Sequence, residues 1–174
     1  MPEGGGRINI VLVRHAYAGL ADPEKWPDDE ARPVTPKGAQ RFVKAAKGLA
    51  NAVRPEKVLT SGAKRTWQTA KLLTHYGGWP EPERSVLLEH GSDMRDAAAE
   101  IDRLQGEGIG NVGIVGHEPL LSALISYLLT GEVTDVTTKL KKGGAAWIVY
   151  NGKPGDAHLM WVMPRKALAN LRNP

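Results

Sequence analysis

The sequence predicts an α/β domain, a three-layer α/β/α sandwich whose sheet is mostly parallel with an antiparallel edge strand. Apolar runs of strand length alternate along the chain with segments whose apolar residues recur at helical spacing. Three of these apolar runs end in polar residues just before a helical pattern begins. Two β-rich runs, separated by a turn that contains glycine and proline, close the chain and are typical of a hairpin at a sheet edge.

Composition predicts one globular domain over residues 1–174, since 41% of the residues are hydrophobic and 24% are charged. No apolar run reaches the roughly 18 residues of a membrane span, so no membrane partner is expected. The opening MPEGGGR lacks the apolar core of a signal peptide, which favours the cytoplasm.

The chain contains no cysteine, which excludes disulfides, thiolate metal sites and cysteine nucleophiles. Its net charge of +4 is able to steer anionic substrates toward a cleft. A nucleic-acid partner is not expected, because a binding face would show basic residues interleaved with aromatic ones. We interpret the one tight basic cluster as a solvated charge run; it comprises Lys139, Lys141 and Lys142.

The first strand is predicted at residues 8–14, an apolar run that stops at Arg14 and His15. A polar, proline-rich loop follows over residues 20–36, and loops of this length in compact domains tend to be functional. Thr35 and Pro36 together favour a helix start, a capping hydroxyl before a proline. The buried face of that helix is predicted to comprise Phe42, Ala46, Leu49 and Val53.

A short strand at residues 57–60 ends at Ser61, and a second helix follows directly. Arg65 falls in its first turn, off the apolar stripe, and is expected to point toward the end of the sheet. That stripe comprises Ala63, Trp67, Ala70 and Leu73. After a break with glycines and prolines, residues 86–88 favour a short strand.

Ser92 and Asp93 cap a third predicted helix, whose apolar face comprises Met94, Ala97, Ile101 and Leu104. The next strand, residues 112–115, closes with Gly116 and His117, and a helix follows from Pro119 to Gly131. Residues 145–150 and 157–162 form the hairpin. Among the tryptophans, Trp67, Trp147 and Trp161 are expected in the core, whereas Trp26 and Trp79 lie in loops at the rim of a cleft.

Polar residues stand at three strand-to-helix junctions: Arg14-His15, Ser61 with Arg65, and Gly116-His117. In a parallel sheet with right-handed crossovers such junctions lie at the same edge, so two guanidinium groups and two imidazoles are expected to converge there. The helices that start behind them present free backbone N–H groups, and an arginine guanidinium is able to donate two parallel hydrogen bonds to the oxygens of one phosphate. The arrangement suits a phosphoryl group.

A neutral imidazole is the best remaining nucleophile in a chain without cysteine and without a Gly-x-Ser-x-Gly elbow. Attack on phosphorus would give a phosphohistidine that water then hydrolyses. A two-histidine, carboxylate metal site is the alternative, but no short ligand spacing supports it and the arginines repel cations. Its ligands would be His15, His117, Asp93 and Glu89. We therefore expect neither a metal nor a cofactor.

Three segments, LVRHAYAG, SGAKRTWQTA and VGHEP, resemble in this order the motifs of the histidine phosphatase superfamily, also called the phosphoglycerate mutase-like fold. The resemblance implies that His15 is the phosphorylated nucleophile and that Arg14 and Arg65 clamp the phosphate. It also implies that His117 binds the phosphoryl group and stabilises its transition state. The sequence departs from the family pattern at Ala16 (usually Gly), Gly62 (usually Pro) and Thr66 (commonly Ala). Ala16 and Gly62 are small residues and are not expected to disturb the phosphate clamp, and we expect Thr66 to be neutral.

The segment RPVTPKG at residues 32–38, the small size of the chain and the sequence GHEP resemble the SixA-type phosphohistidine phosphatases. Arg32 is then either a further phosphate contact or a solvated loop residue. The resemblance places the proton donor at Glu89, with Asp93 and His90 as alternatives, although SixA-type members are able to work without one.

The expected function is a phosphatase that acts through a covalent phosphohistidine, with a phosphohistidine on a protein as its substrate. A small phosphate ester is the alternative substrate, and a binder of phosphorylated ligands without turnover is a third hypothesis. The sequence predicts neither the partner protein nor the oligomeric state.

Overall fold

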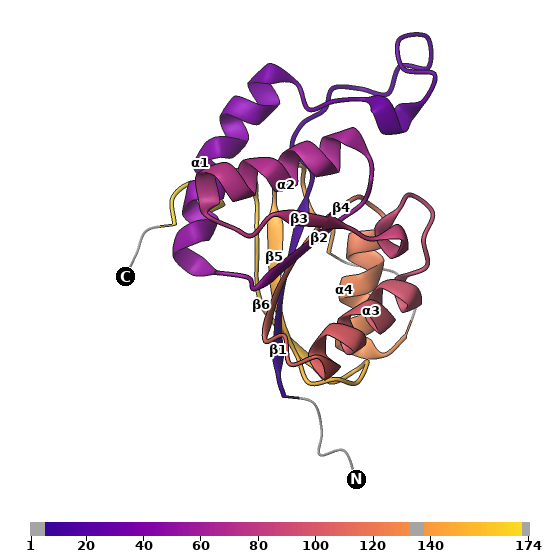
Figure 1. Ribbon diagram of the computed structural model, residues 1–174, viewed down its shortest axis with the longest axis vertical. Helices are drawn as coiled ribbons and strands as arrows, with labels where there is room; N and C mark the ends of the chain where they lie inside the picture. The colour runs from indigo at the N-terminus through magenta and orange to yellow at the C-terminus, as the bar shows by residue number, and fades with distance from the viewer. Residues whose placement is uncertain (1–5, 133–137, 172–174) are drawn as a thin grey trace.

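The computed structural model describes residues 6–132 and 138–171, and within them one sheet holds six strands in the order β3-β2-β4-β1-β5-β6 (Figure 1). The strands are β1 (Ile8–Arg14), β2 (Lys57–Thr60), β3 (Pro82–Arg84), β4 (Asn111–Gly116), β5 (Ala145–Tyr150) and β6 (Ala157–Met163). The helices are α1 (Pro36–Ala52), α2 (Lys64–Gly77), α3 (Met94–Gly106), α4 (Leu120–Thr130) and α5 (Arg165–Leu168). Two 3-10 helices are η1 (Asp29–Ala31) and η2 (Val86–Leu88).

Strands β3, β2, β4 and β1 are parallel, as the alternation of strands and helices predicts. Strand β5 runs antiparallel to β1, and β6 pairs antiparallel with β5. The predicted hairpin at the sheet edge is therefore confirmed, with β6 as the edge strand and β5 as the strand that runs against the parallel set.

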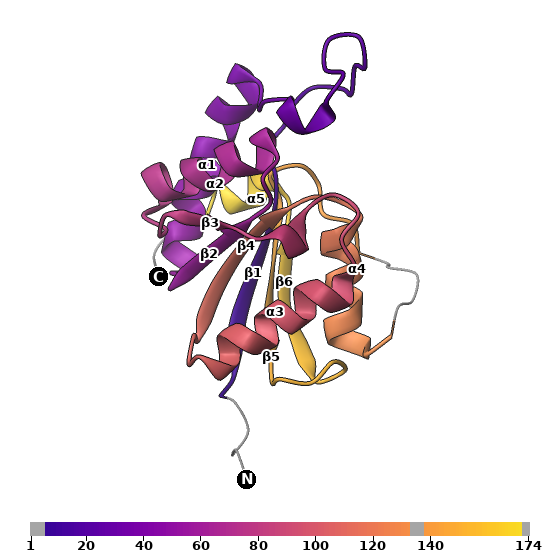
Figure 2. The same ribbon diagram turned by 45° about the vertical axis from the view of Figure 1, so that its right-hand side comes forward.

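Helices cover both faces of the sheet (Figure 2). Successive side chains of β1 point to opposite faces, so Val11 and Val13 pack with α1, α2 and α5, whereas Ile10 and Leu12 pack with α3 and α4. The two apolar clusters lie on either side of one sheet, which confirms the three-layer prediction. None of the helices in the described part of the chain is long and apolar enough to span a membrane.

The helix boundaries follow the predicted capping residues. Thr35 Oγ1 accepts the Gly38 N–H at 2.9 Å and Pro36 occupies the first turn of α1, while Asp93 caps α3. Gly78 ends α2 in the left-handed region at φ 66°, where a side chain would be strained. The predicted core residues Phe42, Ala46, Leu49 and Val53 are all buried.

The strand predicted at residues 86–88 is wrong: these residues form η2, and the strand at this place is β3. The prediction of a strand at residues 86–88 rested on apolar side chains alone. The two prolines before these residues argued against a strand further upstream, where β3 lies. Pro82 pairs with Val58 at the outer edge of the sheet, where its missing N–H leaves no partner strand unsatisfied.

Two tryptophan predictions are also wrong. Trp67 is 38% exposed, because α2 turns its side with Arg65, Thr66 and Thr69 toward the polar end of the sheet. Trp79 is buried rather than at a rim, and its ring covers β4 at Gly113, where a Cβ atom would come within 2.6 Å of it. Trp147 and Trp161 are partly buried, with ring centroids 6.1 Å apart.

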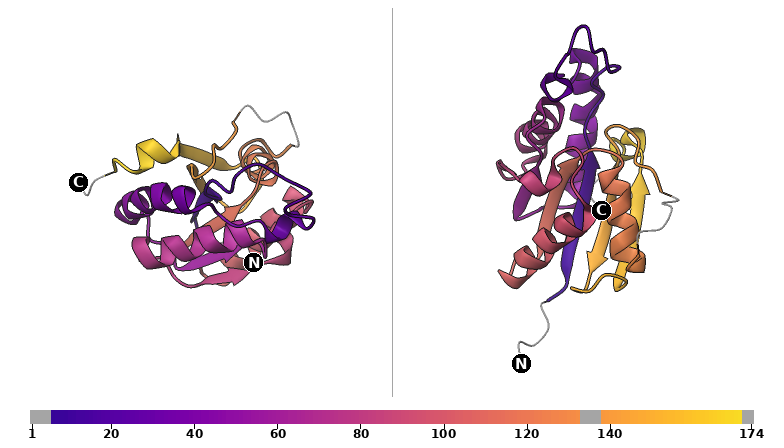
Figure 3. Two further views of the ribbon diagram at one scale, coloured as in Figure 1. Left: turned by 90° about the horizontal axis from the view of Figure 1, so that it is seen from above. Right: turned by 90° about the vertical axis from the view of Figure 1, so that its right-hand side faces the viewer.

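The carboxyl ends of β1, β2 and β4 share one end of the molecule. The long segment between β1 and α1, which includes η1, stands over this end, opposite to the start of β1 (Figure 3). The parallel register thus brings together the three junctions that the sequence singles out.

Candidate functional site

The three predicted junctions meet at the carboxyl end of the sheet. In the ladders Arg14 lies opposite Gly116, and the His15 N–H donates to the Gly116 carbonyl at 3.1 Å. The rings of His15 and His117 are 5.8 Å apart between centroids. A pocket of about 300 Å³ opens beside them. It is lined by Arg14, His15, Gly19, Leu20, Ala21, Asp29, Arg32, Arg65, His90, His117, Glu118 and Lys142.

His15 is held as a neutral ring with one free nitrogen. Its Nδ1 lies 2.7 Å from the Ala16 carbonyl oxygen, which only accepts, so Nδ1 carries the proton. Burial, together with the positive charge of Arg65, lowers the pKa of His15 to about 3. At neutral pH Nε2 therefore presents an unprotonated lone pair, which is what attack on phosphorus requires.

His117 is 3% exposed, and burial, followed by the charge of Arg65, lowers its pKa to about 4. Its Nε2 lies 2.7 Å from Ser61 Oγ. Its Nδ1 is buried and has no hydrogen-bond partner among the described residues. One edge of the ring is thus fixed by the protein, and the other is open to a ligand.

Arg14 and Arg65 each leave the buried Nε–H without a partner in the described part of the chain. Arg14 Nη1 donates to the Leu140 carbonyl at 2.8 Å, and Arg65 Nη1 donates to the Asp29 carbonyl at 2.7 Å. Burial lowers the pKa of both guanidinium groups, which still keep their charge at neutral pH. Buried unpaired donors in a native structure call for a ligand, and two cationic ones favour an oxyanion.

Arg32 lines the same pocket but uses most of its donors to hold the loop. Its Nη1 donates to the carbonyls of Ala18 and Gly19 at 3.0 and 3.1 Å, and its Nε lies 2.8 Å from Asp29 Oδ1. The sequence left open whether Arg32 is solvated or contacts the ligand. It is 8% exposed and lies at the site.

Glu89 lies beside the pocket, and two N–H groups bind its carboxylate. Its Oε1 accepts the Gly62 N–H at 2.9 Å and the Arg84 Nε–H at 2.9 Å. A proline at position 62 would have no N–H to give, and a Cβ atom there would lie 2.6 Å from Arg84 Nε. Glycine at this position therefore determines how Glu89 is held, so the departure from Ser-Pro is not neutral for Glu89.

The two alternative proton donors lie in different places. His90 is exposed and lines the pocket, with its ring 6.2 Å from that of His117. Asp93 accepts the Arg95 N–H at 2.7 Å as the cap of α3 and does not line the pocket. Within the described residues no group of three histidines or carboxylates is arranged to hold a metal ion.

Asp29 is a site residue that the sequence analysis missed. Its carboxylate lies 2.8 Å from Arg32 Nε and 3.2 Å from Arg65 Nη2. The hydrogen bond from Arg32 lowers the pKa of Asp29, so the carboxylate stays ionised. A single acidic residue at the start of η1 has no pattern that connects it to Arg65, and only the folded loop brings the two together.

Lys142 is the second residue missed, and its assignment to a solvated charge run is wrong. It is half-buried at the pocket, 5.0 Å above the ring of Tyr17, whereas Lys139 and Lys141 are exposed. Burial and the charge of Arg14 lower the pKa of Lys142. It reaches the site because the Gly143 N–H donates to the carbonyls of Arg14 and His15.

Glu118 connects the start of α4 with Arg14. Its Oε1 accepts the Leu140 N–H at 3.0 Å, and the Leu140 carbonyl accepts from Arg14. The same carboxylate accepts from the Ser122 hydroxyl at 2.7 Å. Glu118 thereby fixes the chain segment that orients the guanidinium group of Arg14.

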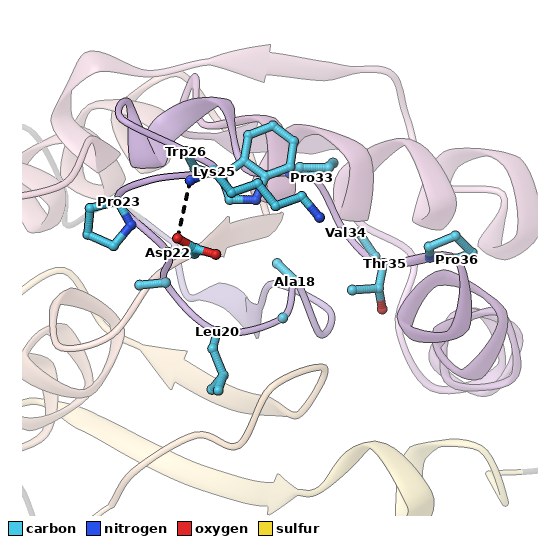
Figure 4. A pocket seen from close by; sticks show the side chains of 12 residues that line it. Ala18, Leu20, Asp22, Pro23, Lys25, Trp26, Pro33, Val34, Thr35 and Pro36 are labelled. Atoms are coloured by element: carbon cyan, nitrogen blue, oxygen red, sulfur yellow. Dashed lines mark hydrogen bonds between the residues drawn. The ribbon is translucent and has the colours of Figure 1, made fainter.

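A second hollow, of about 640 Å³, lies next to the site and is formed by the segment between β1 and α1 together with Pro36 at the start of α1 (Figure 4). It shares Gly19, Leu20 and Ala21 with the pocket beside His15, so these residues form the wall between the two. Trp26 lies at this hollow, in the loop where the sequence predicts a rim.

No family model matches the sequence. The chain is 28% identical to an uncharacterized protein of Picosynechococcus sp. over 138 residues, which cover 79% of this chain and 82% of the relative.

The solved structures that resemble this one share its fold. It is similar to the protein histidine phosphatase SixA complexed with tungstate, with a TM-score of 0.80, 24% identity and coverage of 92% of this chain and 99% of the other. A phosphoglycerate mutase from Bacillus anthracis gives a TM-score of 0.69 at 15% identity, covering 95% and 97%. A mycobacterial glucosyl-3-phosphoglycerate phosphatase gives 0.66 at 15%, covering 89% and 98%. The predicted phosphoglycerate mutase-like fold is confirmed.

Proposed function

We propose that this chain is a phosphatase that transfers a phosphoryl group to His15 and then to water. The observation that carries the proposal is the state of His15, a neutral ring with its free Nε2 in a pocket of guanidinium groups. Arg14, Arg65 and His117 line the same pocket, and each has a buried polar atom without a partner among the described residues. Arg32 and Lys142 add positive charge to the same pocket.

In the proposed first step, His15 Nε2 forms a bond to phosphorus as the bond to the leaving atom breaks, and that atom takes a proton. In the second step water attacks the phosphohistidine, inorganic phosphate leaves, and Nε2 regains its lone pair. The guanidinium groups neutralise charge on the phosphoryl oxygens in both steps. We propose that Glu89 or His90 supplies the proton to the leaving atom.

We further propose that the substrate is a phosphohistidine on a protein. The similar SixA structure belongs to a protein histidine phosphatase. The pocket is open at its mouth, where Leu20 is 80% exposed, so a phosphorylated side chain on a protein surface can reach it. The reaction needs neither metal nor cofactor in this proposal, and a single domain in the cytoplasm would carry it out.

The first experiment measures hydrolysis of p-nitrophenyl phosphate in the presence of EDTA, with His15→Ala as the control. We expect turnover in the wild type and none above background in the variant. Acid-labile, alkali-stable phosphate should be trapped on the wild type and map to His15. No turnover above the variant either with or without EDTA would instead identify a binder of phosphorylated ligands, and turnover that appears only without EDTA would indicate a metal.

The second experiment compares kcat/KM on a phosphorylated histidine phosphotransfer domain with kcat/KM on a panel of small phosphate esters. We expect the phosphorylated domain to be preferred. A clear preference for one small ester would replace the protein substrate by a small-molecule one and leave the chemistry at His15 unchanged.

A further inference from the structure

We propose that Thr66 is a positioning residue that acts through Ser61 and determines which ring nitrogen of His117 carries the proton. The inference rests on the proposed function, since it concerns the histidine that faces the phosphoryl group. It assigns a role to a position where the resembled family commonly has alanine.

Three buried groups form a continuous chain of hydrogen bonds. Thr66 Oγ1 lies 2.6 Å from Ser61 Oγ, which lies 2.7 Å from His117 Nε2. Thr66 and Ser61 are fully buried and His117 is 3% exposed. Thr66 Oγ1 also lies 2.9 Å from the carbonyl oxygen of Ala63, at the start of α2. Buried polar chains of this kind impose a direction on each hydrogen bond.

The proton count sets that direction. Thr66 Oγ1 faces two carbonyl oxygens that only accept, those of Ala63 at 2.9 Å and Ser61 at 3.3 Å, so we assign its single proton to this side. The hydrogen bond between the two hydroxyls then uses the proton of Ser61. Ser61 Oγ has no second proton, and it accepts one from His117 Nε2. The neutral ring is thereby protonated at Nε2 and bare at Nδ1.

The open Nδ1 is the nitrogen that gains a proton when an anion arrives. It is buried, has no partner within the described residues, and belongs to a ring that lines the pocket. The charged and titratable groups that affect His117 include Arg65, His90, Glu89, Asp29 and His15. A phosphoryl dianion adds two negative charges to this set, and Nδ1–H then donates to it while Nε2–H stays on Ser61.

Without the hydroxyl at position 66, Ser61 loses its acceptor, and its proton turns to His117 Nε2. The neutral ring then carries its proton at Nδ1. Protonating this ring would break the new bond from Ser61, so the imidazolium form becomes less favourable. Since the resemblance assigns the stabilisation of the transition state to His117, kcat falls more than KM changes.

The test compares Thr66→Val, which keeps the volume, with Thr66→Ser, which restores the hydroxyl. Thr74→Val is the matched control, because Thr74 lies on the same helix and its hydroxyl bonds to the Ala70 and Pro80 carbonyls, away from the site. We expect Thr66→Val to lower kcat on p-nitrophenyl phosphate about tenfold. Thr66→Ser and Thr74→Val should stay within about twofold of the wild type.

Three further readouts separate positioning from a general loss of structure. Nitrogen-15 spectra of the imidazoles, with His117 assigned from a His117→Asn variant, should show Nε2–H in the wild type and Nδ1–H in Thr66→Val. The basic limb of the kcat profile should move to lower pH in Thr66→Val. Adding Thr66→Val to Ser61→Ala should change kcat no further, because Thr66 acts through Ser61.

Unchanged kcat in a folded Thr66→Val variant, the same His117 tautomer in both proteins, or additive losses with Ser61→Ala would overturn the inference. A wild type that forms no phosphohistidine would contradict the proposed function instead. In that case the tautomer measurement still decides the role of Thr66, since it needs no turnover.

Discussion

Asp29 and Arg65 make a two-point contact in the pocket beside His15. Arg65 Nη1 donates to the Asp29 carbonyl at 2.7 Å, and Arg65 Nη2 lies 3.2 Å from Asp29 Oδ2. The same carboxylate binds Arg32, so two guanidinium groups of the pocket share one internal anion. An incoming phosphoryl group must either share the two guanidinium groups with this carboxylate or displace the carboxylate from them.

Asp29→Asn removes the charge and keeps the size of the side chain, so phosphate should bind more tightly. We expect the inhibition constant of inorganic phosphate to fall about three- to tenfold, the scale of one charge-assisted hydrogen bond. Glu24→Gln, the same loss of charge at an exposed place in the same loop, is the control and should change little. Weaker phosphate binding in Asp29→Asn would mean that the carboxylate orients the arginines rather than competes with the ligand.

Lys142→Gln should raise KM for p-nitrophenyl phosphate about three- to tenfold and weaken its dependence on ionic strength, because one cation leaves the pocket. Lys141→Gln makes the same change at an exposed neighbour and should leave both quantities unaltered. Equal effects of the two substitutions would show that net charge, rather than the place of Lys142, is responsible.

The proton donor is found by varying the leaving group. Glu89 Oε1 accepts from Gly62 and Arg84, both of which stabilise a carboxylate, whereas His90 lines the pocket. We expect His90→Gln to slow hydrolysis of an alkyl phosphate at least about tenfold more than that of p-nitrophenyl phosphate, whose leaving group needs no proton. Glu89→Gln should slow both substrates alike, and the reverse pattern would assign the donor to Glu89.

The two buried histidines make stability depend on pH. Their pKa values, about 3 for His15 and about 4 for His117, lie below the ordinary 6.5, so the unfolded chain binds more protons in between. The free energy of unfolding should therefore fall as pH drops below 6.5, by about 1 kcal/mol per ring between pH 6 and 5. Urea titrations of the wild type and of a His15→Asn, His117→Asn variant measure this, and parallel pH profiles would contradict it.

The sequence predicts the order of elements because local signals mark most boundaries. Thr35 with Pro36 begins α1 and Asp93 caps α3, and neither signal depends on residues far along the chain. The sequence also predicts that four site residues lie close together, because parallel strands end at one edge of the sheet. These residues are Arg14, His15, Arg65 and His117. Their positions follow from topology alone.

The rest of the site depends on contacts that no local pattern encodes. Lys142 reaches the pocket through the bonds of Gly143 to the end of β1, and its neighbours Lys139 and Lys141 look the same in sequence. The spacing of Trp67 places it on an apolar stripe of α2. The helix instead buries its polar face against the site, and Trp67 is exposed. Thr66 was expected to be neutral because its partner Ser61 becomes a partner only in the fold.

Gly62 and Arg84 constrain the order in which this part of the chain is able to change. A Cβ atom at position 62 lies 2.6 Å from Arg84 Nε, so any larger residue displaces a guanidinium group that pairs with Glu89. Proline at that position removes the second donor to Glu89 as well. Replacement of Arg84 first leaves Glu89 with the Gly62 N–H, whereas replacement of Gly62 first removes both partners at once. Replacement of Arg84 first is therefore the less costly order, and in a variant library at the two positions Gly62→Pro alone should lower the rate of phosphate ester hydrolysis more than Arg84→Ala alone.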